Sequence, residues 1–499
     1  MRYVCLTLMA IWMSTGASDA ADINVAPGES INAAIASAND GDVIVLAAGT
    51  YTEGVSIDTL GKSISIAGVA DNNGDGLPET ILDGANLHRI LVCQSGETNS
   101  TWFQNLVIQN GKAEYYAGPD YSGACCYYDD AEGEICNMVP QLECFEMEGM
   151  WFGLGVPCTD PTVPCDLPPG RATREDSFGW YVGGGMLNAE GSSPTLVNCI
   201  FRYNKAETYE FRGAGMYNHN DSNPTLYNCT FDSNDSDLGS GGIENDGSSP
   251  ILNNCTFINN SGNDGGGLGS SGGNVTCANC TFINNRSYAG GGVSQTYGSL
   301  SMTNCRFVQN DANRGFDWGN GGGLQTYLSN VALEGCTFEG NFAKEYGGAI
   351  SLAYGQTTLS NCTFTDNSAN ESTGGVRFSS DDPEYTLAVS GSTFMNNTAP
   401  SGGGLTIGSQ TTVVTISQSS FCGNSPEQIV GAWHDNGDNT IETDCPDCES
   451  DLDGNLIIDI QDLLHVIGSW NTPAGDVSGD GNTDVEDLLQ VIDDWGMNC

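Results

Sequence analysis

A short motif, C-x-F-x-x-N, recurs along the middle of the chain and limits the folds that the sequence can adopt. Seven complete copies begin at Cys199, Cys229, Cys255, Cys280, Cys305, Cys336 and Cys362, and degenerate copies follow around Phe394 and Phe421. The phenylalanine recurs at a similar interval from one copy to the next. A period of about 26 residues is too short for a propeller blade and matches one turn of a right-handed parallel β-helix. A leucine-rich repeat has a similar period, but the sequence lacks its regular L-x-x-L-x-L pattern.

Two further marks run in phase with this motif. Paired glycines, or Gly-Ala-Gly, precede an aliphatic residue at Met186, Met216, Ile243, Leu268, Val293, Leu324, Ile350, Val376 and Leu405. An apolar residue three positions before the cysteine recurs at Leu196, Leu226, Leu252 and Leu359. Residues two apart on a strand face the same side, so Cys and Phe point into the lumen together. Coils stacked about 4.8 Å apart then build columns of like residues.

Turn residues occupy the corners of the predicted coil. We expect the motif Asn at a bend, in the left-handed backbone that Asn tolerates, with its amide bonded to the Asn of the next coil. The paired glycines are expected to supply positive φ at the next corner. At the N-terminus, 30–38 predicts a short helix that covers the open first coil. Strand-like segments follow at 40–51, 62–68, 81–84, 90–93 and 103–110, and they bring the total to roughly 12 coils.

The repeats and the N-terminal segment resemble known families. The C-x-F-x-x-N and Gly-Gly-aliphatic marks resemble the repeats of chlamydial polymorphic outer membrane proteins. GDVIVLAAGTYTEGVSI, at 41–57, is similar to the opening of pectin-lyase-like β-helix proteins. The resemblance implies an all-β fold, a right-handed parallel β-helix over 21–430, with a Cys-rich insertion at 112–182.

The charge and the N-terminal segment restrict location and partners. Asp and Glu outnumber Lys and Arg by 63 to 14, and the formal net charge is −49. Such a chain lacks the clustered cations that nucleic acids and anionic membrane surfaces require. Residues 1–20 read as a secretory signal peptide, and no later stretch has 18 apolar residues. We therefore expect a secreted protein, or one on the extracellular surface, without a membrane span.

The sequence has 20 cysteines, 19 of them after the predicted signal peptide, and most of these fall into three groups. The first, from Cys199 to Cys362, repeats one inward position, where direct stacking gives poor disulfide geometry and favours small buried hydrophobes. The second contains Cys125, Cys126, Cys136, Cys144, Cys158 and Cys165 and predicts a three-bridge module, with all pairings open. The third contains Cys422, Cys445, Cys448 and Cys499, and the last two flank the final module.

Two acidic loops near the C-terminus indicate calcium. Both place oxygen-bearing side chains at loop positions 1, 3, 5, 9 and 12, and position 7 offers a carbonyl, as Ca²⁺ requires. The ligands predicted for one ion are Asp451, Asp453, Asn455, Ile457 (carbonyl), Asp459 and Asp462. Those for the other are Asp476, Ser478, Asp480, Asn482 (carbonyl), Asp484 and Asp487. An apolar helix follows each loop, and a core this small depends on the ions for its order.

These paired loops, which begin at Asp451 and Asp476, resemble a type I dockerin over 448–499, after a linker at 431–447. The resemblance implies an EF-hand-like module that binds a cohesin-like or other surface protein. Leu456 stands where the first loop would have its turn glycine, whereas Gly481 is present in the second. The first site is therefore expected to bind calcium more weakly.

The turn between the motif Asn and the paired glycines varies in length, and we call it the variable turn. Basic and aromatic residues gather there, and the candidate glycan-binding residues are Lys205, Tyr209, Phe211, Arg212, Tyr288, Arg314, Phe316, Trp318 and Tyr346. Variable turns along one edge of a solenoid are often its binding face. A second row, Tyr297, Tyr327 and Tyr354, recurs on three consecutive coils and is interpreted as stacked turn aromatics.

An enzymatic function is weighed against recognition. Polysaccharide lyases and glycoside hydrolases use this fold, but fold alone does not establish activity. Aligned coils give no adjacent Asp pair and no convincing catalytic cluster, and the chain has four His. We therefore expect a non-catalytic scaffold for carbohydrate recognition, with a dockerin-like protein-interaction module. The alternative is a polysaccharide lyase or glycoside hydrolase in polysaccharide catabolism.

Overall fold

The computed structural model describes residues 20–116, 122–129, 133–140, 150–154, 180–206, 211–315, 319–380, 382–408, 413–445, 450–453 and 458–495. Within these ranges the side chains of 114–116, 122–129, 133–140, 150–154, 180–181 and 211 are not described. The predicted signal peptide lies almost wholly outside the described residues.

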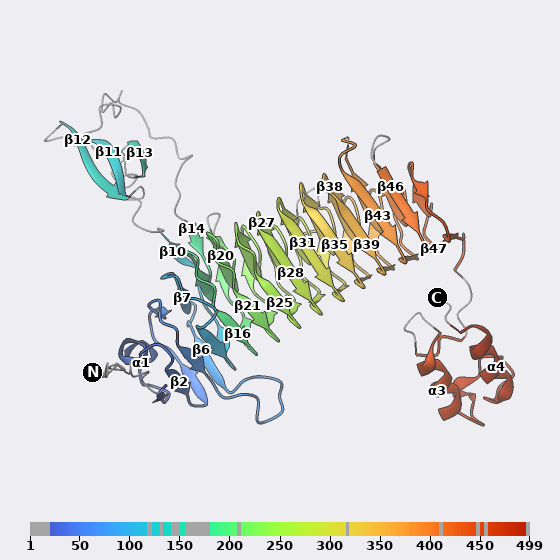
Figure 1. Ribbon diagram of the computed structural model, residues 1–499, viewed down its shortest axis with the longest axis horizontal. Helices are drawn as coiled ribbons and strands as arrows, with labels where there is room; N and C mark the ends of the chain where they lie inside the picture. Colours follow the sequence, from blue (N-terminus) through green and yellow to red (C-terminus); the bar gives the residue numbers. More distant parts are fainter. Residues whose placement is uncertain are drawn as a thin grey trace, which may run out of the picture.

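Three long parallel sheets wind the chain into a solenoid, as the repeat predicts (Figure 1). We call them sheet A, with 14 strands, sheet B, with 13 strands, and sheet C, with 12 strands. Each full coil passes along sheet C, then sheet A, then sheet B, and returns to sheet C through the variable turn. Like residues therefore occupy the same place on successive coils.

Sheet A contains β1 (Asp22–Val25), β2 (Val43–Leu46), β5 (Ser65–Ala67), β8 (Trp102–Gln104), β16 (Thr195–Val197), β21 (Thr225–Tyr227), β25 (Ile251–Asn253), β28 (Asn274–Ala278), β31 (Ser299–Thr303), β35 (Asn330–Glu334), β39 (Thr357–Ser360), β43 (Thr386–Ser390), β46 (Val413–Ser417) and β49 (His434–Asp435). Sheet B contains β3 (Gly49–Tyr51), β6 (Thr80–Asp83), β9 (Val107–Gln109), β17 (Ile200–Arg202), β22 (Thr230–Asp232), β26 (Thr256–Ile258), β29 (Thr281–Ile283), β32 (Arg306–Val308), β36 (Thr337–Glu339), β40 (Thr363–Thr365), β44 (Thr393–Met395), β47 (Ser420–Cys422) and β50 (Thr440–Ile441).

Sheet C contains β4 (Ile57–Asp58), β7 (Leu91–Cys93), β15 (Met186–Asn188), β20 (Met216–His219), β24 (Ile243–Asp246), β27 (Leu268–Ser271), β30 (Val293–Thr296), β34 (Leu324–Tyr327), β38 (Ile350–Ala353), β42 (Val376–Ser379), β45 (Leu405–Ile407) and β48 (Ile429–Val430). Short strands also pair within the variable turns. Strand β18 (Lys205–Ala206) pairs with β23 (Asp235–Ser236). Strand β37 (Phe342–Ala343) pairs with both β33 (Asp311–Ala312) and β41 (Ser368–Ala369).

The lumen contains the predicted columns. The motif phenylalanines from Phe201 to Phe421 are fully buried, and neighbouring rings stack with centroids 4.3 to 5.2 Å apart. The aliphatic residues that follow the glycines, from Met186 to Leu405, are fully buried on the opposite wall. Burial of this apolar column supplies the main driving force for folding.

The motif asparagines form the predicted ladder, but not in the predicted backbone conformation. The side chain of Asn285, for example, donates to Asn310 Oδ1 over 3.0 Å and to the carbonyl of Phe257 over 2.9 Å. The left-handed residue is the one before each motif Asn, such as Asn284 with φ of 52°. The expectation of a left-handed motif Asn was wrong. The backbone N–H of each motif Asn must point along the ladder, because it donates to the side-chain oxygen of the Asn on the next coil, as Asn285 N–H does to Asn310 Oδ1.

The paired glycines also differ from the expectation. Positive φ occurs at the residue three before the aliphatic one, such as Gly290 with φ of 63° before Val293. The two glycines that follow are needed for space. A Cβ on Gly292 would lie 2.7 Å from the carbonyl oxygen of Gly323 and 2.9 Å from the ring of Phe307. Glycine therefore lets the next coil and its phenylalanine approach closely.

The cysteine column is buried and reduced. Cys199, Cys229, Cys255, Cys280, Cys305, Cys336 and Cys362 are free thiols, which confirms their interpretation as small buried residues. Each thiol contacts a carbonyl oxygen two residues earlier, as Cys199 does with Val197 at 3.5 Å. Burial raises the pKa of the Cys229 thiol well above its ordinary value, so this group is neutral and unreactive.

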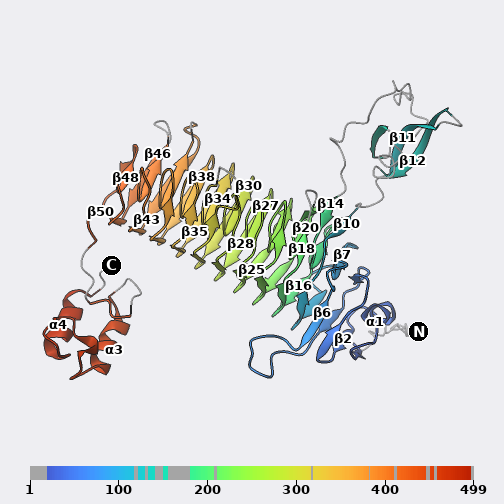
Figure 2. The ribbon, with the colours of Figure 1, turned by 180° about the vertical axis from the view of Figure 1, so that it is seen from behind.

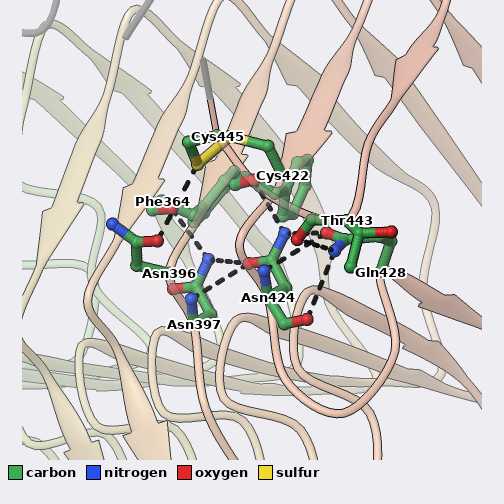
Figure 3. The surroundings of a disulfide bond; sticks show 9 residues. Phe364, Asn396, Asn397, Cys422, Asn424, Gln428, Thr443 and Cys445 are labelled. Atoms are coloured by element: carbon green, nitrogen blue, oxygen red, sulfur yellow. Dashed lines mark hydrogen bonds between the residues drawn. A yellow bond between two sulfur atoms is a disulfide. The ribbon is translucent and has the colours of Figure 1, made fainter. Parts of the chain in front are cut away.

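Both ends of the solenoid are covered. At the N-terminus, α1 (Ile31–Ser37) is capped by Ser30 and buries Ile31 and Ile35 against the first coil, which confirms the predicted helix. At the other end a disulfide joins Cys422 to Cys445 (Figure 3). Beside it, Asn424 at the end of the ladder donates to the side chain of Gln428 over 2.5 Å. The side-chain amide of the last asparagine in the ladder therefore finds its hydrogen-bond acceptor in its own turn.

The insertion leaves the solenoid after β9 and returns before β15. Its strands β11 (Ser122–Asp129), β12 (Gly133–Pro140) and β13 (Met150–Leu154) form an antiparallel sheet, seen apart from the solenoid in Figure 1. Strand β10 (Glu114–Tyr116) pairs with β14 (Trp180–Val182), and β14 pairs with β19 (Phe211–Arg212). The predicted three-bridge pairing of its cysteines lies outside the described side chains.

The C-terminal module is helical. It contains α3 (Ile460–Gly468), the short helix η1 (Pro473–Gly475) and α4 (Val485–Asp493), which are coloured red in Figures 1 and 2. Each of the two longer helices begins inside a predicted calcium loop. Cys448 and Cys499, which flank this module, lie outside the described residues. Among the residues described, no helix has the length and apolar character needed to cross a bilayer.

Candidate calcium centre and solenoid surfaces

The first calcium loop is organised by the buried carboxylate of Asp462. Its Oδ1 accepts hydrogen bonds from the backbone N–H groups of Leu452 and Asp453, at 2.7 and 3.1 Å. Its Oδ2 accepts one from Asp459, at 2.8 Å. Carboxylate oxygens of Asp451, Asp453 and Asp462 lie within 4.8 Å of one another. Three hard anionic oxygens at this separation match the ligand set that Ca²⁺ prefers.

The second loop repeats this geometry at the equivalent positions. Asp487 is fully buried, and its Oδ1 accepts from the N–H groups of Val477 and Ser478, at 2.8 and 2.7 Å. Asp476 accepts from the N–H groups of Asp480 and Gly481, which fold the loop inward. Gly481 has a φ of 95°, so the turn requires this glycine.

Most of the predicted ligands are placed by these bonds, with two exceptions. Asn455 and Ile457 of the first loop lie outside the described residues, as does Leu456. Asp459 and Asp484 serve as helix N-caps and accept from the N–H groups of Gln461 and Glu486. These two carboxylates thus orient each helix at the edge of its loop.

The helices of this module share a small core and leave two matching apolar rows exposed. Ile458, Val466, Val477 and Val491 are buried between them. The exposed apolar side chains are Ile460, Leu464, Ile467 and Trp470 from the first half, and Val485, Leu489, Ile492 and Trp495 from the second. Each member of one row has its counterpart at the equivalent position of the other half.

The variable turns lie in register along one edge of the solenoid. Parallel bridges join Ala289 to Asn320, Asn320 to Tyr346, and Tyr346 to Ser372. Tyr288 and Tyr346 are half-buried on this edge, and Lys205 is exposed at its beginning. Tyr209, Phe316 and Trp318 lie outside the described residues, and the side chain of Phe211 is not described.

Basic residues of the edge are held by carboxylates and carbonyls of neighbouring turns. Arg314 donates to Asp235 over 3.0 Å and to the carbonyl of Ser236, although these residues are almost 80 positions apart. Its side chain is only 16% exposed. The guanidinium of Arg377 lies 4.2 Å from the ring centre of Tyr346. Arg314 therefore ties its own turn to the turn three coils earlier, while Tyr346 presents a ring backed by a cation.

Sheet C carries a cluster of titratable groups that the sequence repeats did not reveal. Glu244, Asp246, Tyr217 and His219 face outward from β20 and β24. Asp246 Oδ2 lies 3.2 Å from His219 Nδ1 and 3.3 Å from the Tyr217 hydroxyl. The hydrogen bond with His219 holds the pKa of Asp246 below its ordinary value. These four side chains come from strands in register, whereas Ser240 and Asp264, which complete the surroundings of Glu244, come from variable turns without a fixed register.

Glu244 is buried and held by Ser240. The Ser240 hydroxyl lies 2.5 Å from Glu244 Oε2 and 2.6 Å from the carbonyl oxygen of Asp264. The backbone N–H of Ser240 also donates to Glu244 Oε2, over 2.8 Å. Glu244 is 5% exposed, and burial raises the pKa of its carboxyl to about 7, against the lowering effects of the Ser240 hydroxyl and of Arg212.

We expect Glu244 to make stability depend on pH. Because its folded pKa is raised from 4.5 to about 7, its favourable contribution is complete below pH 4.5 and is lost as the pH rises to 7. This corresponds to about 3 kcal/mol. Glu244→Gln does not ionise, so its free energy of unfolding relative to wild type should increase by about that amount between pH 4.5 and 8. Denaturant titrations of both proteins measure the difference, and parallel pH curves would contradict it.

Comparison with known families agrees with the coil register. The model of the right-handed β-helix region matches 180–328 and 313–445, together more than half of the chain. The chain belongs to the right-handed β-helix family. This confirms the predicted fold class and its handedness, whereas the predicted relation to polymorphic outer membrane proteins and to dockerins rests on the sequence motifs alone. No curated protein matches the sequence.

Several solved β-helix structures share the backbone architecture at low sequence identity. A mannuronic acid-specific polysaccharide family 6 lyase from human gut microbiota is 12% identical, with a TM-score of 0.39 over 88% of this chain and 86% of that one. The pectate lyase Pel9A is 11% identical, with a TM-score of 0.37 over 79% and 78%. PfbA, a surface adhesin of Streptococcus pneumoniae, is 12% identical, with a TM-score of 0.31 over 83% and 86%. The function of this β-helix protein is therefore argued from its own residues.

Proposed function

We propose that this β-helix protein is secreted, binds calcium and recognises carbohydrate without catalysing a reaction. Its C-terminal module is proposed to dock it to a cohesin-like or other surface protein. The observation that carries this proposal is the pair of matching apolar rows on α3 and α4, from Ile460 to Trp470 and from Val485 to Trp495. Isolated exposed apolar residues are ordinary, but a duplicated row favours a bound partner.

Calcium supports the docking module in this proposal. The carboxylates of Asp451, Asp453 and Asp462 converge, and the Asp487 loop repeats the same backbone bonds. With the ions bound, the repulsion among these carboxylates is neutralised and both helices are held against one core.

Carbohydrate recognition is proposed for the solenoid, and the variable turns are one candidate surface. Tyr288 and Tyr346 place aromatic rings on turns in register, and Arg377 lies against the second ring. Aromatic rings beside a few polar groups are typical of sites for sugars and other small ligands. The absence of catalysis is supported by Glu244, whose carboxyl is buried and bonded to Ser240.

A second candidate function is polysaccharide cleavage, and one observation favours it. Glu244 has a pKa of about 7, suited to a general acid, and Asp246 lies two residues along the same strand and is held ionised. If the turn carrying Ser240 moved aside, this pair would face solvent.

A single panel separates the two candidate functions. The secreted protein is incubated with neutral and anionic polysaccharides, with and without Ca²⁺, and reducing ends, ultraviolet absorbance and retention on each polymer are measured. We expect retention on at least one polymer and no product from any. Product formation that is lost in both Glu244→Gln and Asp246→Asn would establish the enzyme instead. Absence of retention on every polymer would contradict carbohydrate recognition.

A further inference from the structure

Four tyrosines form a continuous row on the outside of the solenoid, and we call it the tyrosine row. They are Tyr297, Tyr327, Tyr354 and Tyr385, from four successive coils. Neighbouring ring centres are 6.4, 5.7 and 5.9 Å apart, and neighbouring planes are 76° to 83° apart. The phenylalanines inside the lumen stack with planes within 23° of one another. The tyrosines therefore contact edge to face, and Tyr297 and Tyr327 keep 52% and 41% of their surface exposed.

The backbone of this row is strained for the residues it carries. The corner after sheet C is left-handed on successive coils, and earlier coils place Asn220, Gly247 and Gly272 there. Tyr297 and Tyr354 adopt the same conformation, with φ of 59° and 55°. This conformation costs a residue with a bulky side chain about 1–2 kcal/mol of conformational free energy that it does not cost glycine. Glu190 and Leu328 occupy the same corner on other coils, with φ of 55° and 51°, so the tyrosines are distinguished by the exposed edge-to-face row that their rings form.

A shallow depression lies on the outer face of sheet A, on coils that also carry tyrosines of the row. It has a volume of about 270 Å³ and is lined by outward side chains of β31, β35 and β39, which Figure 1 labels on one face of the solenoid. We call these side chains the hydroxyl floor: Ser301, Thr303, Ala332, Glu334, Thr358 and Ser360. Ala332 is in register between Ser301 and Thr358, and its small side chain creates the hollow. Ser301 and Thr358 each follow a row tyrosine by four residues, so row and floor run along the same coils.

We infer that the tyrosine row and the hydroxyl floor together bind an uncharged polysaccharide chain lying along the solenoid axis. Exposed rings offer apolar faces to the C–H groups of pyranose rings, and the floor offers hydroxyls to sugar hydroxyls. The coil repeat of about 4.8 Å is comparable with the length of one sugar unit, so successive coils meet successive units. This inference rests on the proposed carbohydrate recognition and assigns it a surface other than the variable turns.

Charge selects the class of polysaccharide. Glu334 is the one charged side chain of the floor, and the chain as a whole has a net charge of −49. A polyuronate or sulfated chain would be repelled over its whole length, because no basic side chain of the floor neutralises it. A neutral glycan meets no such penalty and can accept or donate hydrogen bonds at every unit.

Affinity electrophoresis of the full secreted chain tests this inference. The gels contain hydroxyethyl cellulose or glucomannan as neutral polymers, and polygalacturonate or alginate as anionic ones. The row variant carries Tyr297→Asn and Tyr354→Asn, which remove the rings and relieve the backbone strain, so unfolding cannot explain a loss. The matched control carries Tyr203→Asn, which removes an exposed tyrosine from a left-handed position, with φ of 56°, outside both the row and the variable turns. We expect retardation by a neutral polymer, about tenfold weaker for the row variant and unchanged for the control.

The outcomes separate this inference from the proposed function. If the wild type is retarded and the row variant equally so, or if only the control loses binding, the solenoid recognises glycans elsewhere and the inference is wrong. Retardation by anionic polymers alone contradicts the assigned ligand class. If no polymer retards the wild type, carbohydrate recognition itself fails. The thermal midpoint of the row variant should equal or exceed that of the wild type, and a lower value would contradict the strain argument.

Discussion

Replacing Asn310 with Asp should destabilise the solenoid by about 4 kcal/mol, because each buried polar group left without its partner costs about 1–3 kcal/mol. The Asn310 amide donates to the carbonyl of Phe282 and to Asn341 Oδ1, both over 2.9 Å. Its Oδ1 accepts from the side chain and backbone of Asn285, both over 3.0 Å. A carboxylate keeps the accepting role but cannot donate, and it places a charge where water does not reach.

Chemical denaturation followed by circular dichroism measures this loss. The matched control is Asn304→Gly, at the exposed left-handed corner before Cys305, where φ is 51°. Glycine adopts this conformation freely, so the control should change stability by less than about 1 kcal/mol. Similar unfolding midpoints for the two variants would show that the ladder contributes little. Partial recovery of the Asp variant at low pH is also expected, since a protonated carboxyl can donate once.

Removal of calcium should unfold the C-terminal module while the solenoid stays folded. Among the described residues of the module, the buried apolar core consists of Ile458, Val466, Val477 and Val491, and the two loops concentrate carboxylates that repel one another without a cation. Ligand at a hundredfold excess over its dissociation constant contributes about 2.7 kcal/mol per site. We therefore expect chelator to abolish the helical signal and a separate low-temperature transition, leaving the β-sheet transition in place.

One substitution in each loop tests whether that loop binds its own calcium ion. Asp453→Asn should weaken the first site and Asp480→Asn the second, so each should reduce the stoichiometry seen by titration calorimetry from two to one. Asp493→Asn removes the same charge from an exposed position of α4 and should leave both sites intact. A helical signal that persists in chelator, or equal binding by all three variants, would contradict the calcium assignment.

Periodicity made the interior of this protein predictable. Cys280 and Phe282 repeat at a fixed offset, Val293 and its equivalents directly follow the paired glycines, and alternation along short strands decides which side chains face the lumen. Because coils stack in register, one correct coil predicts its neighbours. The predicted ladder partners followed for the same reason.

The remaining features depend on local geometry that periodicity does not encode. One left-handed residue lies one place before the motif Asn. A second left-handed residue lies directly before the motif Cys, and the sequence signal for it was the Asn at this position, such as Asn279 before Cys280. The Glu244 cluster needs Ser240 and Asp264, which come from turns of unequal length. Cys422 and Cys445 were both named, but their pairing depends on how the chain folds back over the final coil.

The bridge between Cys422 and Cys445 also bears on self-assembly. Strands β49 and β50 have two residues each, and a parallel sheet that ends in an open strand can recruit another molecule. The bridge keeps residues up to Cys445 folded across the terminal layer. Under reducing conditions this lid would loosen, the hydrogen-bonding groups of the terminal layer would be exposed, and molecules would associate in pairs through that end, because α1 still covers the other end. Oxidised particles should stay separate in light scattering.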